Sequence, residues 1–414
     1  MRLAICGGEK LRLAPFTQWP LYSEKEFIEI VDLLKETPLF RGINFPSYWY
    51  GDLSTKSNFI EKFEMDFSKL HDCKYGFCLN SGTTALDLSL KALDLTKEDE
   101  VLVSPYTYFA SASSIKKSGA KPVFVDIEAQ TLNMDPLKAA ESISSKTKGM
   151  VIVHFGGIPA DMEKYKNLAV QNNLWIVEDC CHTAYASIDG KSVGSFGRIG
   201  CFSFQSSKLI SSGEGGAIVT NDLQTAEYIY SHHNGGREHL NSDRESFLYL
   251  GGNYRLSSAN IAMLCVGMKN SYQQFFIRER NVGYFKSRIK QIPGVTLIDM
   301  NNDRIRRDYY IIALRFNKSE FKGLSLKRFV LALNAEGIPC STGYKKALYE
   351  HKVLLSEQAD WSQYREKCTE TVKALEEIIW LSHWLFLGNT KDMDDIINAI
   401  IKVKESVDEL VRNR

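Results

Sequence analysis

The sequence predicts an α/β protein with a large domain built on a mostly parallel central sheet and a smaller C-terminal α+β domain. Between residues 76 and 178, short apolar runs alternate with amphipathic segments. The apolar runs are continuous, which is typical of strands buried on both faces of a parallel sheet. After residue 269, helical patterns mix with strand-like runs such as Tyr309–Phe316. A chain of 414 residues is long enough for two domains. We expect residues 1–268 to form an N-terminal arm and the large domain, and residues 269–414 the small domain.

The segment before the alternation predicts an arm, two helices and a loop. Residues 1–20 carry no clear periodicity and are expected to be extended. Glu24–Leu34 and Phe59–Leu70 place apolar residues at helical spacing. Residues 41–56 are rich in aromatic and turn-forming residues and predict a loop.

The alternation itself predicts the parallel sheet. The expected strands are Gly76–Leu79, Glu100–Ser104, Pro122–Asp126, Gly149–His154 and Leu174–Glu178. The expected helices between them are Ala85–Leu93, Ala110–Ser118, Asp135–Ser144 and Asp161–Asn172. Further strands are expected at Cys201–Phe204 and Ala217–Thr220, and further helices at Ala226–His232 and Ser257–Val266.

Composition excludes several classes of protein. A formal net charge of +1 gives no global field that would favour nucleic acid or an acidic membrane. No apolar run approaches the length of about 20 residues that spans a bilayer, and charges interrupt the apolar N-terminus, so no signal peptide is expected. The nine cysteines contain no CxxC pair, so we expect no metal site, and they indicate a reducing cytoplasm.

Two charged residues stand at the ends of predicted buried strands. Asp179 follows the apolar run Leu174–Val177, and Lys208 lies between a strand and a glycine-rich turn. Pyridoxal 5'-phosphate needs an amine for a Schiff base and an acid that keeps its ring nitrogen protonated. The pair therefore predicts a pyridoxal phosphate site, although a buried carboxylate can also form a salt bridge or a cap, and a lysine can lie on the surface.

Three weaker features accompany this pair. Ser81–Thr84 follows a strand and opens a helix, where backbone N–H groups bind anions, although a simple helix cap has the same sequence. Tyr108 follows the next strand and either stacks on a flat ring or packs in the core. Ser203 either contacts a phosphate or is an ordinary strand serine.

These stretches resemble the DegT/DnrJ/StrS aminotransferases, which act on keto-sugars and cyclitols. The similarity covers nearly the whole chain and is most specific around Lys208 and its GEGGA tail. The matching stretches include Asn80–Leu90 (NSGTTALDLSL), Val101–Asp126, Pro159–Met162, Glu178–His182 (EDCCH), Gly194–Asp222 and Gly252–Leu256 (GNYRL). The resemblance implies fold type I of the pyridoxal-phosphate-dependent transferases.

The resemblance also implies a role for individual residues. Lys208 would bind the cofactor covalently and Asp179 would pair with its ring nitrogen. His182 matches a position near the ring hydroxyl, and Tyr108 matches the aromatic residue on the ring face. The residues that match phosphate contacts are Gly82, Thr83, Ser203 and, from the other subunit, Asn253. A homodimer with a shared active site is therefore expected.

The implied activity is amino transfer from L-glutamate or L-glutamine to a keto-sugar or keto-cyclitol. The sequence looks closest to the glutamine:scyllo-inosose aminotransferases and the 3-amino-5-hydroxybenzoate synthases. An aminodehydratase of the latter type and a non-catalytic cofactor-binding regulator remain alternatives. Arg255 and Tyr344 are candidates for substrate contacts, while Cys180-Cys181 and Tyr185 depart from the family pattern and leave the substrate open.

Overall fold

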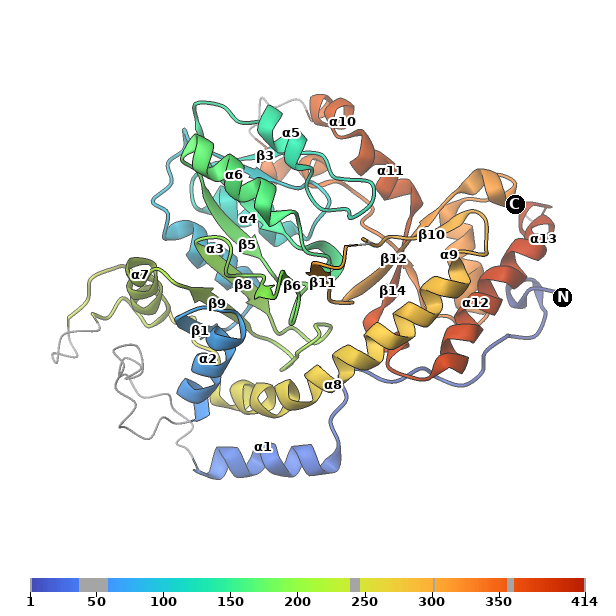
Figure 1. Cartoon of the computed structure of the whole chain (residues 1–414), viewed down its shortest axis with the longest axis horizontal. Coiled ribbons are helices and arrows are strands. Elements are labelled where there is room, and N and C mark those ends of the chain that lie inside the picture. Colours follow the sequence, from blue (N-terminus) through green and yellow to red (C-terminus); the bar gives the residue numbers. More distant parts are fainter. Residues whose placement is uncertain (1, 37–58, 239–245, 301, 356–360, 413–414) are drawn as a thin grey trace.

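The larger part of the computed structural model is built on a seven-stranded sheet with the order β1-β9-β8-β5-β4-β2-β3 (Figure 1). The structure describes residues 2–36, 59–238, 246–300, 302–355 and 361–412, so the predicted loop at residues 41–56 lies outside the described residues. The strands are β1 (Tyr75–Leu79), β2 (Glu100–Val103), β3 (Lys121–Phe124), β4 (Thr147–Val153), β5 (Trp175–Asp179), β8 (Ile199–Ser203) and β9 (Gly216–Thr220). Strand β9 pairs antiparallel with β1 and β8, and the other pairs are parallel. The predicted α/β fold with a mostly parallel sheet is therefore confirmed.

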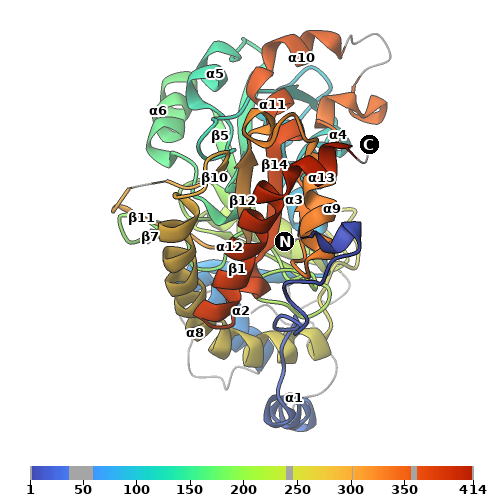
Figure 2. The same ribbon diagram turned by 90° about the vertical axis from the view of Figure 1, so that its right-hand side faces the viewer.

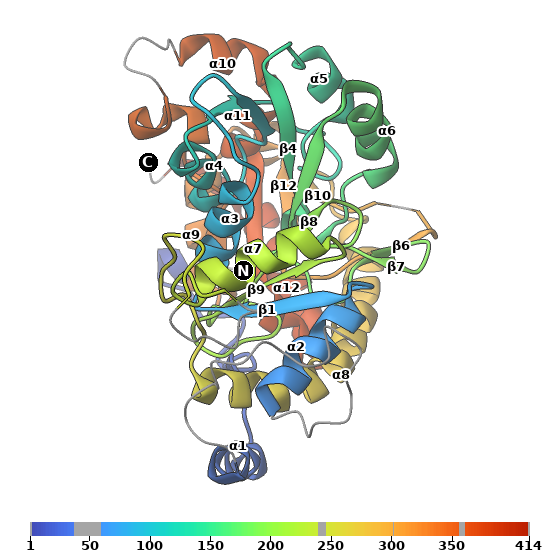
Figure 3. The same cartoon turned by 90° about the vertical axis from the view of Figure 1, so that its left-hand side faces the viewer.

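Helices cover both faces of this sheet. Helices α3 (Gly82–Lys91), α4 (Phe109–Lys117) and α7 (Leu223–His233) pack on the face to which Val101 and Val103 point. Helices α5 (Pro136–Glu141) and α6 (Met162–Asn172) pack on the opposite face with Leu102. Figure 3 shows α3 and α4 on one side of the strands and α6 on the other. Because successive side chains of a strand point to opposite faces, this double cover explains the continuous apolar runs.

Helix α2 (Phe59–Leu70) coincides with its prediction and packs on the same face as α5 and α6, together with the long helix α8 (Ser258–Ile289). Helix α8 has 32 residues and was predicted only as far as Val266. It crosses the expected domain boundary at residue 268 without a break. Its first half packs in the core of the large sheet and its second half in the C-terminal core, and Figure 1 shows it connecting the two parts. The division into two domains remains a proposal.

The C-terminal part contains a four-stranded antiparallel sheet with the order β10-β12-β14-β13. Its strands are β10 (Val295–Leu297), β12 (Ile311–Phe316), β13 (Ser341–Thr342) and β14 (Ile378–Ser382). Its principal helices are α9 (Leu326–Ala335), α10 (Ser362–Lys367), α11 (Thr369–Glu377), α12 (Thr390–Glu405) and α13 (Val407–Arg412). A small third sheet joins β11 (Ile305–Arg306), β6 (Ser187–Ile188) and β7 (Lys191–Ser192).

The N-terminal arm packs on this C-terminal part rather than on the large sheet (Figure 2). The buried carboxylate of Glu336 accepts hydrogen bonds from the backbone N–H groups of Ala4 and Leu11 and from the ammonium of Lys402. The chain then leads to α1 (Glu24–Glu36), which packs on α8 through Ile30. Within the described residues, no helix combines the length and the apolar character that a membrane span requires.

Candidate active site

A cavity of about 480 Å³ opens at the carboxyl ends of the parallel strands, where open α/β sheets bind ligands. The C-terminal part closes its other side. The sequence-predicted residues that line the cavity are Gly82, Thr83, Tyr108, Asp179, His182, Ser203, Lys208 and Tyr344. Eight residues from five separate stretches of the chain therefore meet at one site.

The N-terminus of α3 forms one end of the cavity. Ser81 caps this helix by accepting a hydrogen bond of 3.1 Å from the backbone N–H of Thr84, so the helix begins three residues earlier than predicted. A Cβ atom at Gly82 would lie 2.8 Å from the Cβ of Ser203, which is closer than real side chains approach. Glycine is thus required here, and it leaves room for an anion at the N–H groups and positive dipole end of the helix.

Asp179 lies at the end of β5 and is almost completely buried. The hydroxyl of Ser111 in α4 donates a hydrogen bond of 2.7 Å to Oδ2, and the backbone N–H of Cys181 donates one of 3.2 Å to Oδ1. Hydrogen bonds to both oxygens fix the orientation of the carboxylate. Ser111 was missed at the sequence level because a serine inside a helix gives no signal of its own.

His182 is neutral and has a defined tautomer. Its Nδ1 accepts a hydrogen bond of 3.2 Å from the backbone N–H of Gly156, which places the proton on Nε2. Burial, and after it the positive charge of Lys208, lowers the pKa of His182 well below its ordinary value of 6.5. The ring therefore offers an N–H donor to the cavity.

Lys208 lies in the loop between β8 and β9, and residues of the C-terminal part hold this loop. His383 donates from Nε2 to the carbonyl oxygen of Ser207 over 3.0 Å, and the hydroxyls of Ser207 and Tyr310 lie 2.9 Å apart. The Nζ atom of Lys208 lies 4.2 Å from the centroid of the Tyr310 ring. Neither His383 nor Tyr310 was predicted at the site.

The side of the cavity opposite the sheet is mainly aromatic. It consists of Tyr310, Ile311, Tyr344 and Trp380. The rings of Tyr344 and Trp380 meet edge to face at 4.8 Å. Burial raises the pKa of Tyr344 well above its ordinary value, so its phenol is neutral. Of these residues the sequence indicated only Tyr344.

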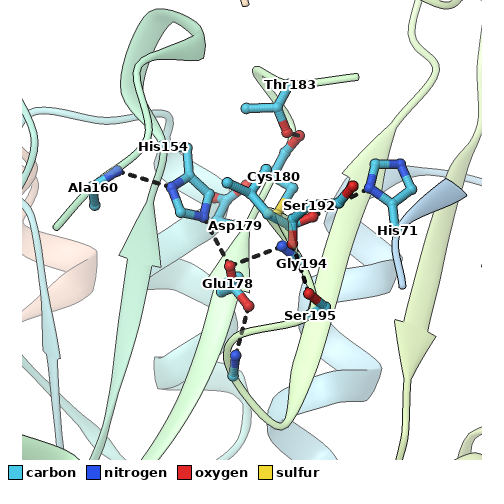
Figure 4. Close-up of polar contacts among 12 residues, drawn as sticks. His71, His154, Ala160, Glu178, Asp179, Cys180, Thr183, Ser192, Gly194 and Ser195 are labelled. Atoms are coloured by element: carbon cyan, nitrogen blue, oxygen red, sulfur yellow. Dashed lines mark hydrogen bonds and ion pairs between the residues drawn. The ribbon is translucent and has the colours of Figure 1, made fainter. Parts of the chain in front are cut away.

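Glu178, which precedes Asp179, does not line the cavity. Figure 4 shows its contacts with His154 and Gly194. One of its oxygens accepts from His154 Nε2 at 3.1 Å and from the N–H of Gly194 at 2.8 Å, and the other accepts from the N–H of Gly197 at 2.6 Å. Ligand atoms of His154, Glu178 and Cys180 lie within 4.8 Å of one another, a spacing that a metal ion could bridge. However, His154 Nδ1 already accepts from the N–H of Ala160, and burial raises the pKa of the Cys180 thiol well above its ordinary value. The hydrogen bonds of this group are satisfied internally, and we assign it a structural role.

Two predicted residues do not line the cavity of their own chain. The side chain of Asn253 is exposed, and Asn253 pairs with Asn234 in an isolated bridge. Arg255 donates a hydrogen bond of 2.8 Å to Asn234 Oδ1. That Asn253 contributes to the site of a second subunit stays a prediction. That Arg255 binds the substrate stays a prediction as well.

Comparison with known proteins identifies the family. Residues 49–401 match the model of the DegT/DnrJ/EryC1/StrS aminotransferase family. The L-glutamine:2-deoxy-scyllo-inosose aminotransferase of Streptoalloteichus tenebrarius is 28% identical, with 99% of both chains covered. The GDP-perosamine synthase of Escherichia coli O157:H7 is 43% identical over 41% of this chain and 47% of its own. The solved structure of 3-amino-5-hydroxybenzoic acid synthase superposes with a TM-score of 0.83 at 25% identity and covers 97% of this chain and all of that one. The chain therefore belongs to the DegT/DnrJ/EryC1/StrS aminotransferase family, has the type I fold of pyridoxal-phosphate-dependent transferases, and is an aminotransferase.

Proposed function

We propose that this enzyme transfers an amino group from L-glutamine or L-glutamate to the ketone of a cyclitol or sugar, with pyridoxal phosphate attached to Lys208. The observation that carries the proposal is the common cavity of Lys208, Asp179 and the N-terminus of α3. The names of the inosose aminotransferase and the perosamine synthase support the substrate class.

The residues present fit this cofactor. The N–H groups of Gly82 and Thr83 with the hydroxyl of Ser203 would hold the phosphate. The buried carboxylate of Asp179 would hold the ring nitrogen, and the Nε2–H of His182 would donate to the ring hydroxyl. Tyr108 would cover a face of the ring. The cavity thus offers a hydrogen-bond donor or acceptor for each polar group of pyridoxal phosphate.

When bound, pyridoxal phosphate supplies an electron sink for the charge left on the donor carbon after loss of its proton. Lys208 removes that proton as a free amine and returns a proton later in the cycle, because it supplies the amine of the cavity lining. Asp179 keeps the ring nitrogen protonated through an electrostatic interaction that is strengthened by burial. His182, being neutral, orients the ring without adding a positive charge.

The proposal includes a homodimer in the cytoplasm, with Asn253 of each chain completing the phosphate site of the other. The exposed position of Asn253 and the nine free cysteines support these two points. Mixing Lys208→Ala with Asn253→Ala chains tests the shared site. Two inactive variants that regain up to a quarter of the wild-type activity per dimer on mixing would support it, and no recovery would contradict it.

Borohydride reduction followed by peptide mass spectrometry tests the main proposal. A pyridoxyl group is expected on the peptide that contains Lys208, and prior incubation with the true donor should prevent this labelling. Wild-type protein that remains unlabelled after incubation with pyridoxal phosphate would overturn the proposal.

The structural similarity to 3-amino-5-hydroxybenzoic acid synthase supports an aminodehydratase as a second candidate. It would use the same residues. Release of water from an amino-cyclohexenone, without transfer of nitrogen from glutamine or glutamate, would favour this second activity.

A further inference from the structure

The side chain of Tyr310 lies directly beside the free amine of Lys208. The Nζ atom lies 4.2 Å from the ring centroid, within the range in which a cation interacts with the face of an aromatic ring. No ion pair joins Lys208 to a carboxylate within the described part of the chain. The ring of Tyr310 is therefore the contact that the structure gives to this amine.

The position of the ring is fixed by its neighbours. Its hydroxyl lies 2.9 Å from the hydroxyl of Ser207, the residue before the lysine. The ring packs on the ring of His182 with a centroid distance of 4.7 Å and an interplanar angle of 33°. Tyr310 directly precedes β12, so it belongs to the C-terminal part, whereas Lys208 and His182 belong to the large sheet.

Hydrogen bonds of Asp308 also connect the segment that contains Tyr310 to the loop that contains His182. This buried carboxylate accepts hydrogen bonds from the backbone N–H groups of residues 184, 185 and 186, at 2.6, 2.7 and 2.9 Å. These residues follow His182 in the loop after β5. Tyr310 is therefore fixed on both sides: Asp308 anchors the chain before it, and strand β12 begins directly after it.

We propose that Tyr310 is a positioning residue that holds the ammonium of Lys208 in the cofactor-free enzyme and, during the cycle, after the released lysine has taken up the donor's proton. The inference rests on the proposed function, in which Lys208 alternates between an attached and a released state. In the released state the cation rests on the ring, close to the reacting groups rather than in solvent. A lysine held there returns to the same place after each release.

This role has a thermodynamic consequence with a defined sign. On attachment the lysine nitrogen and the aldehyde carbon of pyridoxal phosphate form a C=N bond, the aldehyde oxygen leaves with two of the ammonium protons as water, and the nitrogen keeps its third proton. The free ammonium that rests on Tyr310 is consumed in this step. The ring therefore stabilises the released state, and its removal should strengthen covalent binding of the cofactor.

The test compares Tyr310→Leu, which removes the ring, with Tyr310→Phe, which keeps the ring and loses only the hydroxyl. We expect the dissociation constant of pyridoxal phosphate for Tyr310→Leu to fall by about two- to thirtyfold, and that for Tyr310→Phe to stay within about twofold of wild type. A merely structural role would act in the opposite direction, since a damaged site binds the cofactor more weakly. Weaker binding by Tyr310→Leu, or equal behaviour of the two variants, would overturn the proposal.

A second measurement needs no cofactor. Lysines of the cofactor-free protein are reductively methylated with ¹³C-formaldehyde and a borohydride reductant, and the signal of Lys208 is assigned with Lys208→Arg. The ring current of Tyr310 should shift this signal upfield in wild type and in Tyr310→Phe but not in Tyr310→Leu. The absence of this pattern would refute the contact itself. Failure of the wild-type protein to attach pyridoxal phosphate would instead refute the proposed function, so the two failures are distinguishable.

Discussion

Two adjacent carboxylates at the end of β5 have opposite environments. Glu178 faces the protein interior, where three N–H donors surround it, while Asp179 faces the cavity with two donors behind it. The alternation of side chains along a strand is enough to separate them. We therefore expect Glu178 to serve the fold and Asp179 to serve the chemistry, so that substitutions affect stability and activity separately.

The largest effect is expected at the cavity, from Lys208→Ala. This change removes the covalent attachment and the base together, so turnover should fall by about 10⁴-fold or more. The thermal midpoint of the cofactor-free protein should hardly change, because Nζ forms no hydrogen bond or ion pair with a described residue. Steady-state kinetics and calorimetry measure the two quantities. Substantial turnover by this variant would refute the mechanism.

Asp179→Asn tests the functional carboxylate. The loss of one preorganised electrostatic partner typically costs about 10²- to 10³-fold in kcat. The fold should tolerate the change, since the amide can donate to the hydroxyl of Ser111 while its oxygen accepts from the N–H of Cys181. Unchanged kcat, or a large loss of stability, would mean that Asp179 does not act as we propose.

Glu178→Gln is the matched change on the other side of the strand. Either orientation of the amide directs its NH₂ group at an N–H donor, of Gly197 in one case and of His154 and Gly194 in the other. We expect the free energy of unfolding to fall by about 3–5 kcal/mol. Activity per folded, cofactor-loaded molecule should remain within about tenfold of wild type. If both glutamate and aspartate variants lose activity but not stability, the contrast between the two carboxylates fails.

The same contrast explains how far the sequence could predict the molecule. The parallel strands were predictable, because burial on both faces produces continuous apolar runs in the sequence. The positions of Asp179, Lys208 and the turn before α3 were predictable as well, because charged and turn-forming residues there follow directly on such runs. The length of α8 was not, because the part of it after Val266 buries Ser271, Arg278 and Asn281, and polar residues on a buried face interrupt the apolar period.

The partners of the proposed catalytic pair, Asp179 and Lys208, were not predictable for a similar reason. Ser111 and Tyr310 look like an ordinary helix serine and the start of a strand, and only the fold brings them to Asp179 and Lys208. Glu178 could have been suspected, since a second acid at the end of a buried strand needs donors as well. Nothing local in the sequence distinguished its role from that of Asp179.

The smallest expected effect concerns the Glu178 side of the comparison and is tested at His71, whose contribution to the pH dependence of stability vanishes at neutral pH. Its Nδ1 donates to the carbonyl oxygen of Val193, next to Gly194 in the Glu178 network, while the Nε2 atom has no hydrogen-bond partner among the described residues (Figure 4). Burial lowers the pKa of His71 from 6.5 to about 4. The unfolded chain therefore takes up a proton as the pH falls below 6.5, whereas the folded protein does so only near 4.

Stability should accordingly decrease as the pH falls through this window, by about 3 kcal/mol in total from this residue. Unfolding by urea at a series of pH values measures the effect, with His71→Phe as the control. Phenylalanine suits the site because Phe67 and Phe202 already pack on the ring at 4.7 and 4.2 Å. The variant should lose the Val193 hydrogen bond at every pH and gain relative to wild type only in acid. A stability difference between the two proteins that does not change with pH would show that His71 titrates normally, and that the network around Glu178 is more open to water than its burial indicates.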